Sequence, residues 1–213
     1  MNTRMIRINA DSIGPDVIRG IAGTLRQGGV IVYPTDTFYG LGADCFSRAA
    51  LLRITEIKGR PPTKGFLVLV SDAAMARGLA AEVPAAYERL AEVFWPGPLT
   101  MILKAAPHLP YELVGPERTI GVRLPALPWL REMVGTAGFP VVSTSANLSG
   151  GLEIDSGEEA ARQFAAKVDL VVDGGRTAGG RPSTVVDLSS GKPLLRREGP
   201  IPRAALERAI PIF

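Results

Sequence analysis

Short β-branched runs and longer stretches of helical period alternate along the chain. The clearest run covers residues 30–33, Val-Ile-Val-Tyr, where apolar and polar side chains do not alternate. Such a run is typical of a central strand covered on both faces. It passes through Pro34, which cannot donate to a sheet and is expected to end the pairing, into residues 35–42 with hydroxyls, one carboxylate and two glycines. The pattern predicts a buried strand that ends in a polar loop, where open α/β sheets usually bind ligands.

The same reasoning predicts the other elements. Apolar positions at helical spacing, with capping or terminating residues beside them, predict helices over residues 15–28, 47–58, 84–94, 129–134, 156–167 and 202–209. Apolar runs predict strands over residues 66–70, 99–104, 119–123, 140–142, 169–173, 184–188 and 194–197. Strands alternate with helices early and follow one another late. We therefore expect one α/β domain, residues 1–213, with an open sheet of mixed strand direction.

Composition narrows the class of protein. With 213 residues, of which 46% are hydrophobic, the chain can bury one well-formed core. No apolar run approaches the roughly 20 residues that cross a bilayer, and the polar start does not resemble a signal peptide, so we expect a cytoplasmic protein without a membrane partner. The net charge of +3 and the pI near 9.2 suit phosphate-bearing ligands and weak contact with tRNA or other RNA.

Two single residues limit the chemistry. Cys45 is the only cysteine, so the chain forms no internal disulfide and cannot build a thiolate metal site alone. His108 is the only histidine and lies between two prolines, away from the polar stretches. A histidine-based triad or zinc site therefore has too few residues, and we expect no metal site made by protein side chains.

The remaining polar groups suit anionic ligands. Cations occur at Lys58, Arg60, Lys64, Arg123 and Arg197, and hydroxyls or an amide occur at Thr35, Thr37, Thr119, Ser143, Ser145, Asn147 and Ser183. Arginine forks match paired anionic oxygens, whereas lysine supplies a point charge, so this mixture suits phosphate and carboxylate. Cations at a helix end also commonly complement the helix dipole, and hydroxyls at strand ends commonly satisfy turns. Arg123 is harder to explain in this way, because an arginine within an apolar strand needs an anionic partner or a cleft.

Six stretches, taken in order, resemble the YrdC-like family of threonylcarbamoyl-AMP synthases: residues 29–42, 58–61, 95–100, 119–125, 143–150 and 183–187. The resemblance runs from about Gly29 to about Gly199 and matches the short single-domain form. It implies a twisted open sheet with helices around a concave cleft. It also implies that L-threonine, bicarbonate or CO₂, and ATP with Mg²⁺ are joined into threonylcarbamoyl-AMP with release of pyrophosphate. Separate transferase proteins would then use the product to modify tRNA.

The resemblance also implies roles for particular residues. Lys58 and Arg60 are expected to be catalytic. The expected threonine contacts are Thr35, Arg123, Ser143 and Ser183, and the expected ATP contacts are Arg60, Lys64, Thr119, Ser145, Asn147 and Arg197. The chain departs from the family pattern at Gly65-Phe66 and at Leu69, where relatives often have proline-leucine and histidine.

Two other functions fit parts of the pattern. An RNA-binding module would use the mild positive charge, but the motifs offer few stacking aromatics apart from Phe38 and Tyr39. A carbamoyl-handling paralogue would share the fold and use another carbamoyl source or acceptor. Replacing threonine by other amino acids in a pyrophosphate-release assay would separate the second alternative from the synthase.

Overall fold

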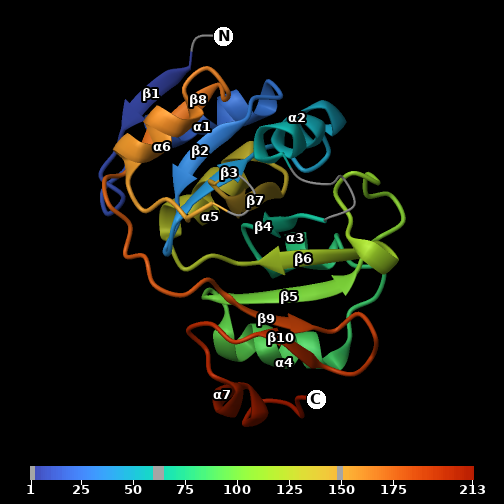
Figure 1. The fold of residues 1–213 in the computed structure, drawn as a ribbon. Helices are drawn as coiled ribbons and strands as arrows, with labels where there is room; N and C mark the ends of the chain where they lie inside the picture. Colours follow the sequence, from blue (N-terminus) through green and yellow to red (C-terminus); the bar gives the residue numbers. More distant parts are fainter. Residues whose placement is uncertain (1–2, 60–64, 148–150) are drawn as a thin grey trace.

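One long sheet carries the architecture of the computed structural model, which describes residues 3–59, 65–147 and 151–213. In those ranges ten strands lie side by side in the order β1-β8-β2-β3-β7-β4-β6-β5-β9-β10 (Figure 1). The strands are β1 (Arg4–Arg7), β2 (Ile31–Pro34), β3 (Tyr39–Gly42), β4 (Leu67–Leu69), β5 (Leu99–Lys104), β6 (Thr119–Arg123), β7 (Val141–Ser145), β8 (Leu170–Asp173), β9 (Thr184–Asp187) and β10 (Leu194–Arg197).

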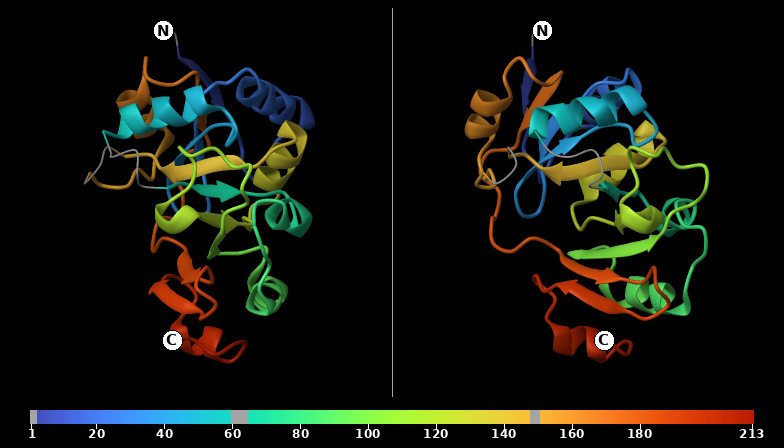
Figure 2. Two further views of the ribbon diagram at one scale, coloured as in Figure 1. Left: turned by 90° about the vertical axis from the view of Figure 1, so that its right-hand side faces the viewer. Right: turned by 45° about the vertical axis from the view of Figure 1, so that its right-hand side comes forward.

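The sheet is mixed in direction and strongly twisted. β1 with β8, β8 with β2, β4 with β6 and β5 with β9 are parallel, whereas the other neighbouring pairs are antiparallel. In Figure 1, β1, β8 and β2 run steeply, while β5, β6 and β9 run across the view. The views in Figure 2 show the same change of direction along the sheet. This agrees with the cumulative twist of neighbouring strands and confirms the predicted open sheet of mixed direction.

Helices cover both faces of the sheet. They are α1 (Pro15–Arg26), α2 (Arg48–Lys58), α3 (Ala73–Arg77), α4 (Ala85–Phe94), η1 (Pro116–Arg118), α5 (Pro128–Ala137), α6 (Gly157–Phe164) and α7 (Arg203–Glu207). Ile31 and Tyr33 of β2 belong to one apolar cluster with α1 and α5. Val30 and Val32 point the other way, into a cluster that includes α2 and α6. The prediction of a central strand covered on both faces is therefore confirmed.

Two strands were not predicted. β3 pairs antiparallel with β2, from Ile31 opposite Gly42 to Pro34 opposite Tyr39, so residues 39–42 belong to a hairpin and Pro34 does not end the pairing. β1 forms an edge of the sheet beside β8. β7 also continues through Ser145, further than the predicted strand over residues 140–142. Within the described ranges, no helix combines the length and apolar character that crossing a bilayer requires.

Candidate functional site

The pairing of β3, β7, β4 and β6 builds the floor of a cavity of about 300 Å³. Side chains at paired positions point to the same face of a sheet. Gly40 lies opposite Ser145, Leu67 lies opposite both Ser143 and Gly121, and Leu69 lies opposite Arg123. This is the face on which α1 and α5 pack farther along the sheet. Six of the predicted contact residues line the cavity: Thr35, Arg123, Ser143, Ser145, Ser183 and Arg197.

The turn between β2 and β3 projects one polar edge into the cavity. The Thr35 hydroxyl donates to the Phe38 carbonyl at 2.6 Å and accepts the Thr37 backbone N–H at 3.2 Å. These local bonds are those that threonine commonly makes in turns.

Tyr39 begins β3, and its phenol donates to the Gly175 carbonyl at 2.7 Å while it accepts the Gly174 N–H at 3.0 Å. Burial raises the Tyr39 pKa to about 12, so the phenol keeps its proton.

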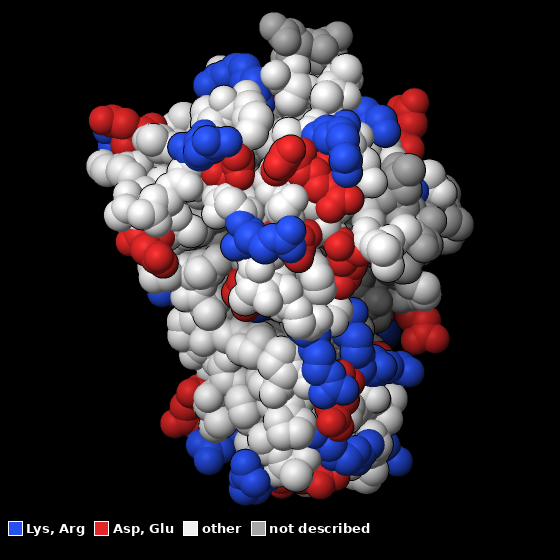
Figure 3. Space-filling model, turned by 60° about the vertical axis from the view of Figure 1, so that its left-hand side comes forward, with Lys and Arg blue, Asp and Glu red and all other residues white. Residues whose placement is uncertain are grey.

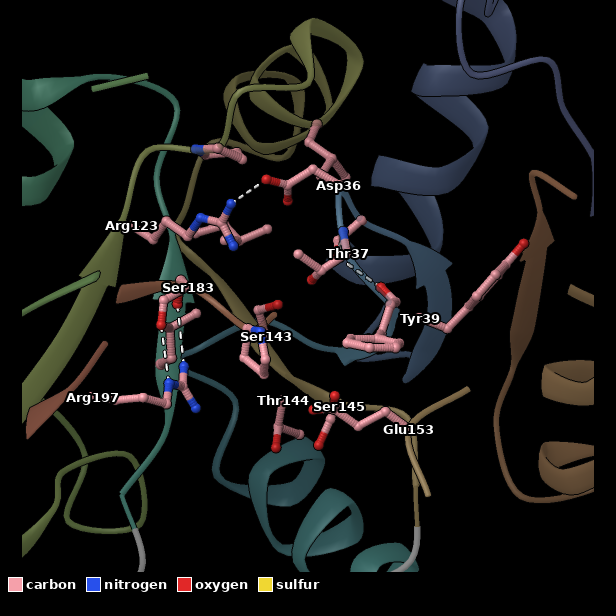
Figure 4. A pocket seen from close by; sticks show the side chains of 18 of the residues that line it. Asp36, Thr37, Tyr39, Arg123, Ser143, Thr144, Ser145, Glu153, Ser183 and Arg197 are labelled. Carbon is pink, nitrogen blue, oxygen red and sulfur yellow. Dashed lines mark hydrogen bonds and ion pairs between the residues drawn. The ribbon is translucent and has the colours of Figure 1, made fainter. Parts of the chain in front are cut away.

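Arg123 is buried, with only 6% of its surface exposed, and points into one end of the cavity (Figure 4). Its Nε donates to the Gly97 carbonyl at 3.0 Å, and its Nη2 donates to Asp36 Oδ2. A Cβ on Gly97 would lie 2.2 Å from the Phe94 carbonyl oxygen, so only glycine fits where this carbonyl meets Arg123. The expected anionic partner is thus present, and it is Asp36, which the sequence analysis did not assign. Asp36 is the one carboxylate in the polar stretch after β2, and that was the available signal.

Arg197 and Ser183 form a second polar group on the same wall (Figure 4). Arg197 Nε donates to the Ser183 carbonyl at 3.0 Å, and Nη2 donates to Ser183 Oγ at 3.3 Å. Burial lowers the pKa of Arg197; the carboxylate of Glu153 opposes this shift and the charge of Arg123 adds to it. Arg196 instead pairs with Asp187 at 2.7 Å. Arg196 and Arg197 therefore face different partners, as expected for neighbouring residues on a strand.

Ser143 lies at the centre of the cavity floor (Figure 4). Burial raises the pKa of Tyr33, and a hydrogen bond with Ser143 and the charge of Arg123 only partly oppose that shift. Tyr33 is therefore a neutral phenol beneath Ser143. The arrangement offers a hydroxyl to a ligand above the floor without bringing a further charge.

Lys58 is the last residue of α2 and is buried. It is only 5% exposed, and its ammonium donates to the carbonyls of Ser145 and Asn147 and to Asn147 Oδ1. A cation at the end of a helix is usually exposed, but Lys58 is buried because the end of α2 packs against the end of β7. Ser145 Oγ donates to Asn147 Oδ1 at 2.7 Å, so Lys58 and Asn147 together orient Ser145. Neither Lys58 nor Asn147 is among the described residues that line the cavity.

Thr119 is also absent from the described lining of the cavity. Its hydroxyl donates to the Pro116 carbonyl at 2.9 Å at the start of β6. The predicted catalytic residue Arg60 and the predicted ATP contact Lys64 lie outside the described residues. The role of Thr119 therefore stays a prediction, as do the roles of Arg60 and Lys64.

The cavity has two further features that sequence reasoning did not assign. Glu153 brings a second carboxylate, at the end near Ser145 and away from Asp36 (Figure 4). Leu67, Leu69 and Leu130 make part of the wall apolar. Strand alternation could have placed the two leucines of β4 on one face, but it could not have shown that this face borders a cavity. Among the described residues, no group of three histidine, cysteine, aspartate or glutamate side chains could hold a metal ion.

Comparisons with known proteins agree with this geometry. The family model Sua5_yciO_yrdC, described as "Telomere recombination", matches residues 23–199. A threonylcarbamoyl-AMP synthase of Pyrococcus abyssi is 37% identical over 193 residues, which cover 91% of this chain and 57% of that protein. A threonylcarbamoyl-AMP synthase of Halorhodospira halophila is 34% identical over 182 residues, which cover 85% of this chain and 95% of that protein.

A solved structure extends the likeness to three dimensions. The crystal structure of P. abyssi Sua5 complexed with L-threonine superposes with a TM-score of 0.90 at 34% identity, over 100% of this chain and 63% of that one. This chain thus spans less than two thirds of the length of the P. abyssi protein. The match of the family model and the near-complete coverage of the H. halophila relative show that this chain belongs to the Sua5/YciO/YrdC family.

Proposed function

We propose that this protein forms threonylcarbamoyl-AMP and pyrophosphate from L-threonine, bicarbonate or CO₂, and ATP, as a nucleotidyltransferase. The observation that carries the proposal is the buried guanidinium of Arg123, which points into a cavity beside hydroxyls and a second arginine. A guanidinium fork is suited to a carboxylate, and L-threonine carries one. The names of the relatives and the threonine complex of P. abyssi Sua5 support this choice of substrate.

The reaction consists of two bond-forming steps. The threonine amine attacks CO₂, a C–N bond forms, and a proton is released to give a carbamate. A carbamate oxygen then attacks the α-phosphorus of ATP, the bond from that phosphorus to the bridging oxygen breaks, and pyrophosphate leaves with the electron pair. Both reactants are anions in the second step, so positioning and charge stabilisation dominate catalysis. This chemistry requires neither a histidine base nor a cysteine nucleophile.

The two arginines divide the cavity in this proposal. Arg123 would bind the threonine carboxylate, and Ser143, Ser183 and the Thr35 turn would contact the rest of the amino acid. Arg197 would face the phosphates together with Ser145. Their guanidinium groups share one wall, with Ser183 between them (Figure 4). Two positive charges on that wall would offset the repulsion between the carbamate and the triphosphate.

Mg²⁺ belongs to the proposal as the companion of ATP. Magnesium is usually bound by one or two carboxylates together with substrate phosphates, so a dedicated cluster of protein ligands is not needed. Glu153 fits this role, because it lines the cavity near Ser145 and its carboxylate acts electrostatically on Arg197, the proposed phosphate contact. The ion would neutralise part of the triphosphate charge.

Direct recognition of RNA has less support. Tyr39 is 1% exposed and its phenol bonds two backbone groups, so it cannot serve as a stacking platform. Acidic and basic side chains are interspersed on the face in Figure 3 and do not form one basic surface there. We therefore propose that tRNA modification requires separate transferase proteins, which use the adenylate this protein makes.

The test is pyrophosphate release by the purified protein with ATP, Mg²⁺ and bicarbonate, with and without L-threonine. We expect release to depend on all components and mass spectrometry to detect threonylcarbamoyl-AMP. Serine, valine and alanine are tested in place of threonine, because a carbamoyl-handling paralogue would release pyrophosphate with a different amino acid. Pyrophosphate release that does not respond to threonine would refute the proposed function.

A further inference from the structure

Asp36 is the strongest feature of the cavity that the proposed function leaves unexplained. Its Oδ2 accepts from Arg123, whereas its Oδ1 is shielded from solvent and accepts no hydrogen bond in the structure. Buried carboxylate oxygens normally have partners. Asp36 also lines the cavity, and its carboxylate lies at the end into which Arg123 points (Figure 4). The Asp36 side chain as a whole is 20% exposed and lines the cavity, so a turn of the carboxylate brings the unpaired oxygen within reach of a donor that arrives with a ligand.

Arg123 has capacity to bind a ligand without losing Asp36. Among the described residues its bonds are those from Nε to Gly97 and from Nη2 to Asp36, and a guanidinium carries five N–H donors. A ligand carboxylate can therefore use the remaining donors, including those on Nη1. The ion pair then presents a positive group and a negative group side by side at one end of the cavity.

We propose that Asp36 binds the α-ammonium group of the amino-acid substrate, so that Asp36 and Arg123 together recognise the zwitterion. This inference rests on the proposed function for the identity of the amino acid. The ammonium and carboxylate of an amino acid are attached to one carbon atom, and the two protein groups that would meet them are in direct contact. Binding gives the unpaired Asp36 oxygen a charged donor. It also fixes the position of the nitrogen, which must release one proton to water before its lone pair can attack CO₂.

Other carboxylates suit this task less well. Glu153 lies at the opposite end of the cavity, near Ser145, and is separated from Arg123 by the floor residues (Figure 4). Asp173 does not line this cavity. Its oxygens accept hydrogen bonds from Arg7 and from the Gly175 N–H. Asp36 is therefore the carboxylate that can meet the ammonium while Arg123 holds the carboxylate.

The test compares L-threonine with 3-hydroxybutanoate, which is threonine without its ammonium group. Calorimetric binding of both ligands is measured for wild type, Asp36→Asn and the control Asp16→Asn, which alters an exposed ion-paired aspartate. Wild type and the control are expected to prefer threonine by about 10- to 150-fold, the range for a charged hydrogen bond. Asp36→Asn is expected to bind the two ligands with similar affinity.

The ratio of the threonine affinity to the 3-hydroxybutanoate affinity shows whether Asp36 contacts the ammonium group or only orients Arg123. If Asp36 only orients Arg123, both ligands will weaken in parallel in Asp36→Asn and the threonine preference will persist, which overturns the inference. Circular dichroism checks the fold. A second measurement needs no variant: the threonine preference of wild type should fall as pH rises through the pKa of the ammonium, and a constant preference also overturns the inference. Absence of any threonine binding by wild type would instead overturn the proposed function.

Discussion

Replacing Arg123 by lysine tests the division of the cavity between the two substrates. Lysine keeps a positive charge but loses the planar fork, and it cannot reproduce both the Nε bond to Gly97 and the Nη2 bond to Asp36. We expect the loss of one charged contact to threonine to cost about 1.5–3 kcal/mol, or about 10- to 150-fold in the threonine KM. The ATP KM should change by less than about threefold, because this guanidinium lies at the other end from Ser145.

The opposite change is expected for Arg197→Lys, which should raise the ATP KM far more than the threonine KM. Its matched control is Arg196→Lys. Arg196 is the neighbouring residue on the same strand, but it pairs with Asp187 and does not line the cavity. This control should leave both KM values near those of wild type. It therefore separates an effect of the cavity from a general effect of altering β10.

The assay is initial-rate pyrophosphate release with each substrate varied at a saturating level of the other. A KM equals a dissociation constant only when chemistry is slow, so calorimetric threonine binding to Arg123→Lys accompanies the kinetics. Thermal unfolding checks that the buried substitution has not altered the fold. Equal effects of Arg123→Lys and Arg197→Lys on both substrates would show that the division of the cavity is wrong, even with the overall reaction intact.

Three further predictions concern residues around the cavity. Lys58→Met should lower the free energy of unfolding by about 1–3 kcal/mol, seen as a fall in Tm, because buried acceptors on Ser145 and Asn147 lose their donor; an unchanged Tm would contradict this. Asp187→Asn should be less stable than wild type in urea at pH 7. Burial raises the Asp187 pKa, but hydrogen bonds from Ser189 and Arg196 and the charge of Arg196 together lower it, so the difference should vanish as pH falls through the lowered pKa; a difference that persists in acid would refute this. The free energy of unfolding should fall as pH rises from about 10 towards about 12, because the Tyr39 phenol ionises first in the unfolded state. Tyr39→Phe should make this fall smaller in alkaline unfolding curves.

The sequence predicted most helices because their signals are local. Ser47 Oγ accepts the Ala50 N–H at the start of α2, and Ser156 Oγ accepts the Glu159 N–H at the start of α6, as the capping pattern indicated. The end of α6 was predicted about three residues too late, since the helix stops at Phe164. Such errors at helix ends are small because capping and periodicity depend on neighbouring residues.

β3 could not be recognised in this way. Two of its four residues are glycine, which is unfavourable in isolated strands, so residues 39–42 looked like a loop. Tertiary contacts explain the glycines: a Cβ on Gly42 would lie 2.5 Å from the Tyr33 ring and 3.2 Å from a Val141 methyl carbon. The strand exists because β2 and β7 pair with it on both sides. Its stability therefore comes from partners that are distant in sequence, and a local pattern does not contain them.

The partner of Arg123 was likewise not predictable from a local pattern. Strand alternation could place Arg123 on a sheet face and could require an anion for it, but choosing Asp36 required the order of strands from β2 to β6. A buried ion pair often adds little net stability, because desolvation offsets the attraction between the charges. Folding alone thus gives a weak reason to keep Asp36 opposite Arg123 with one oxygen unpaired. Recognition of a zwitterionic ligand gives a stronger reason, because the ligand supplies both the carboxylate that Arg123 can still bind and the donor that Asp36 lacks.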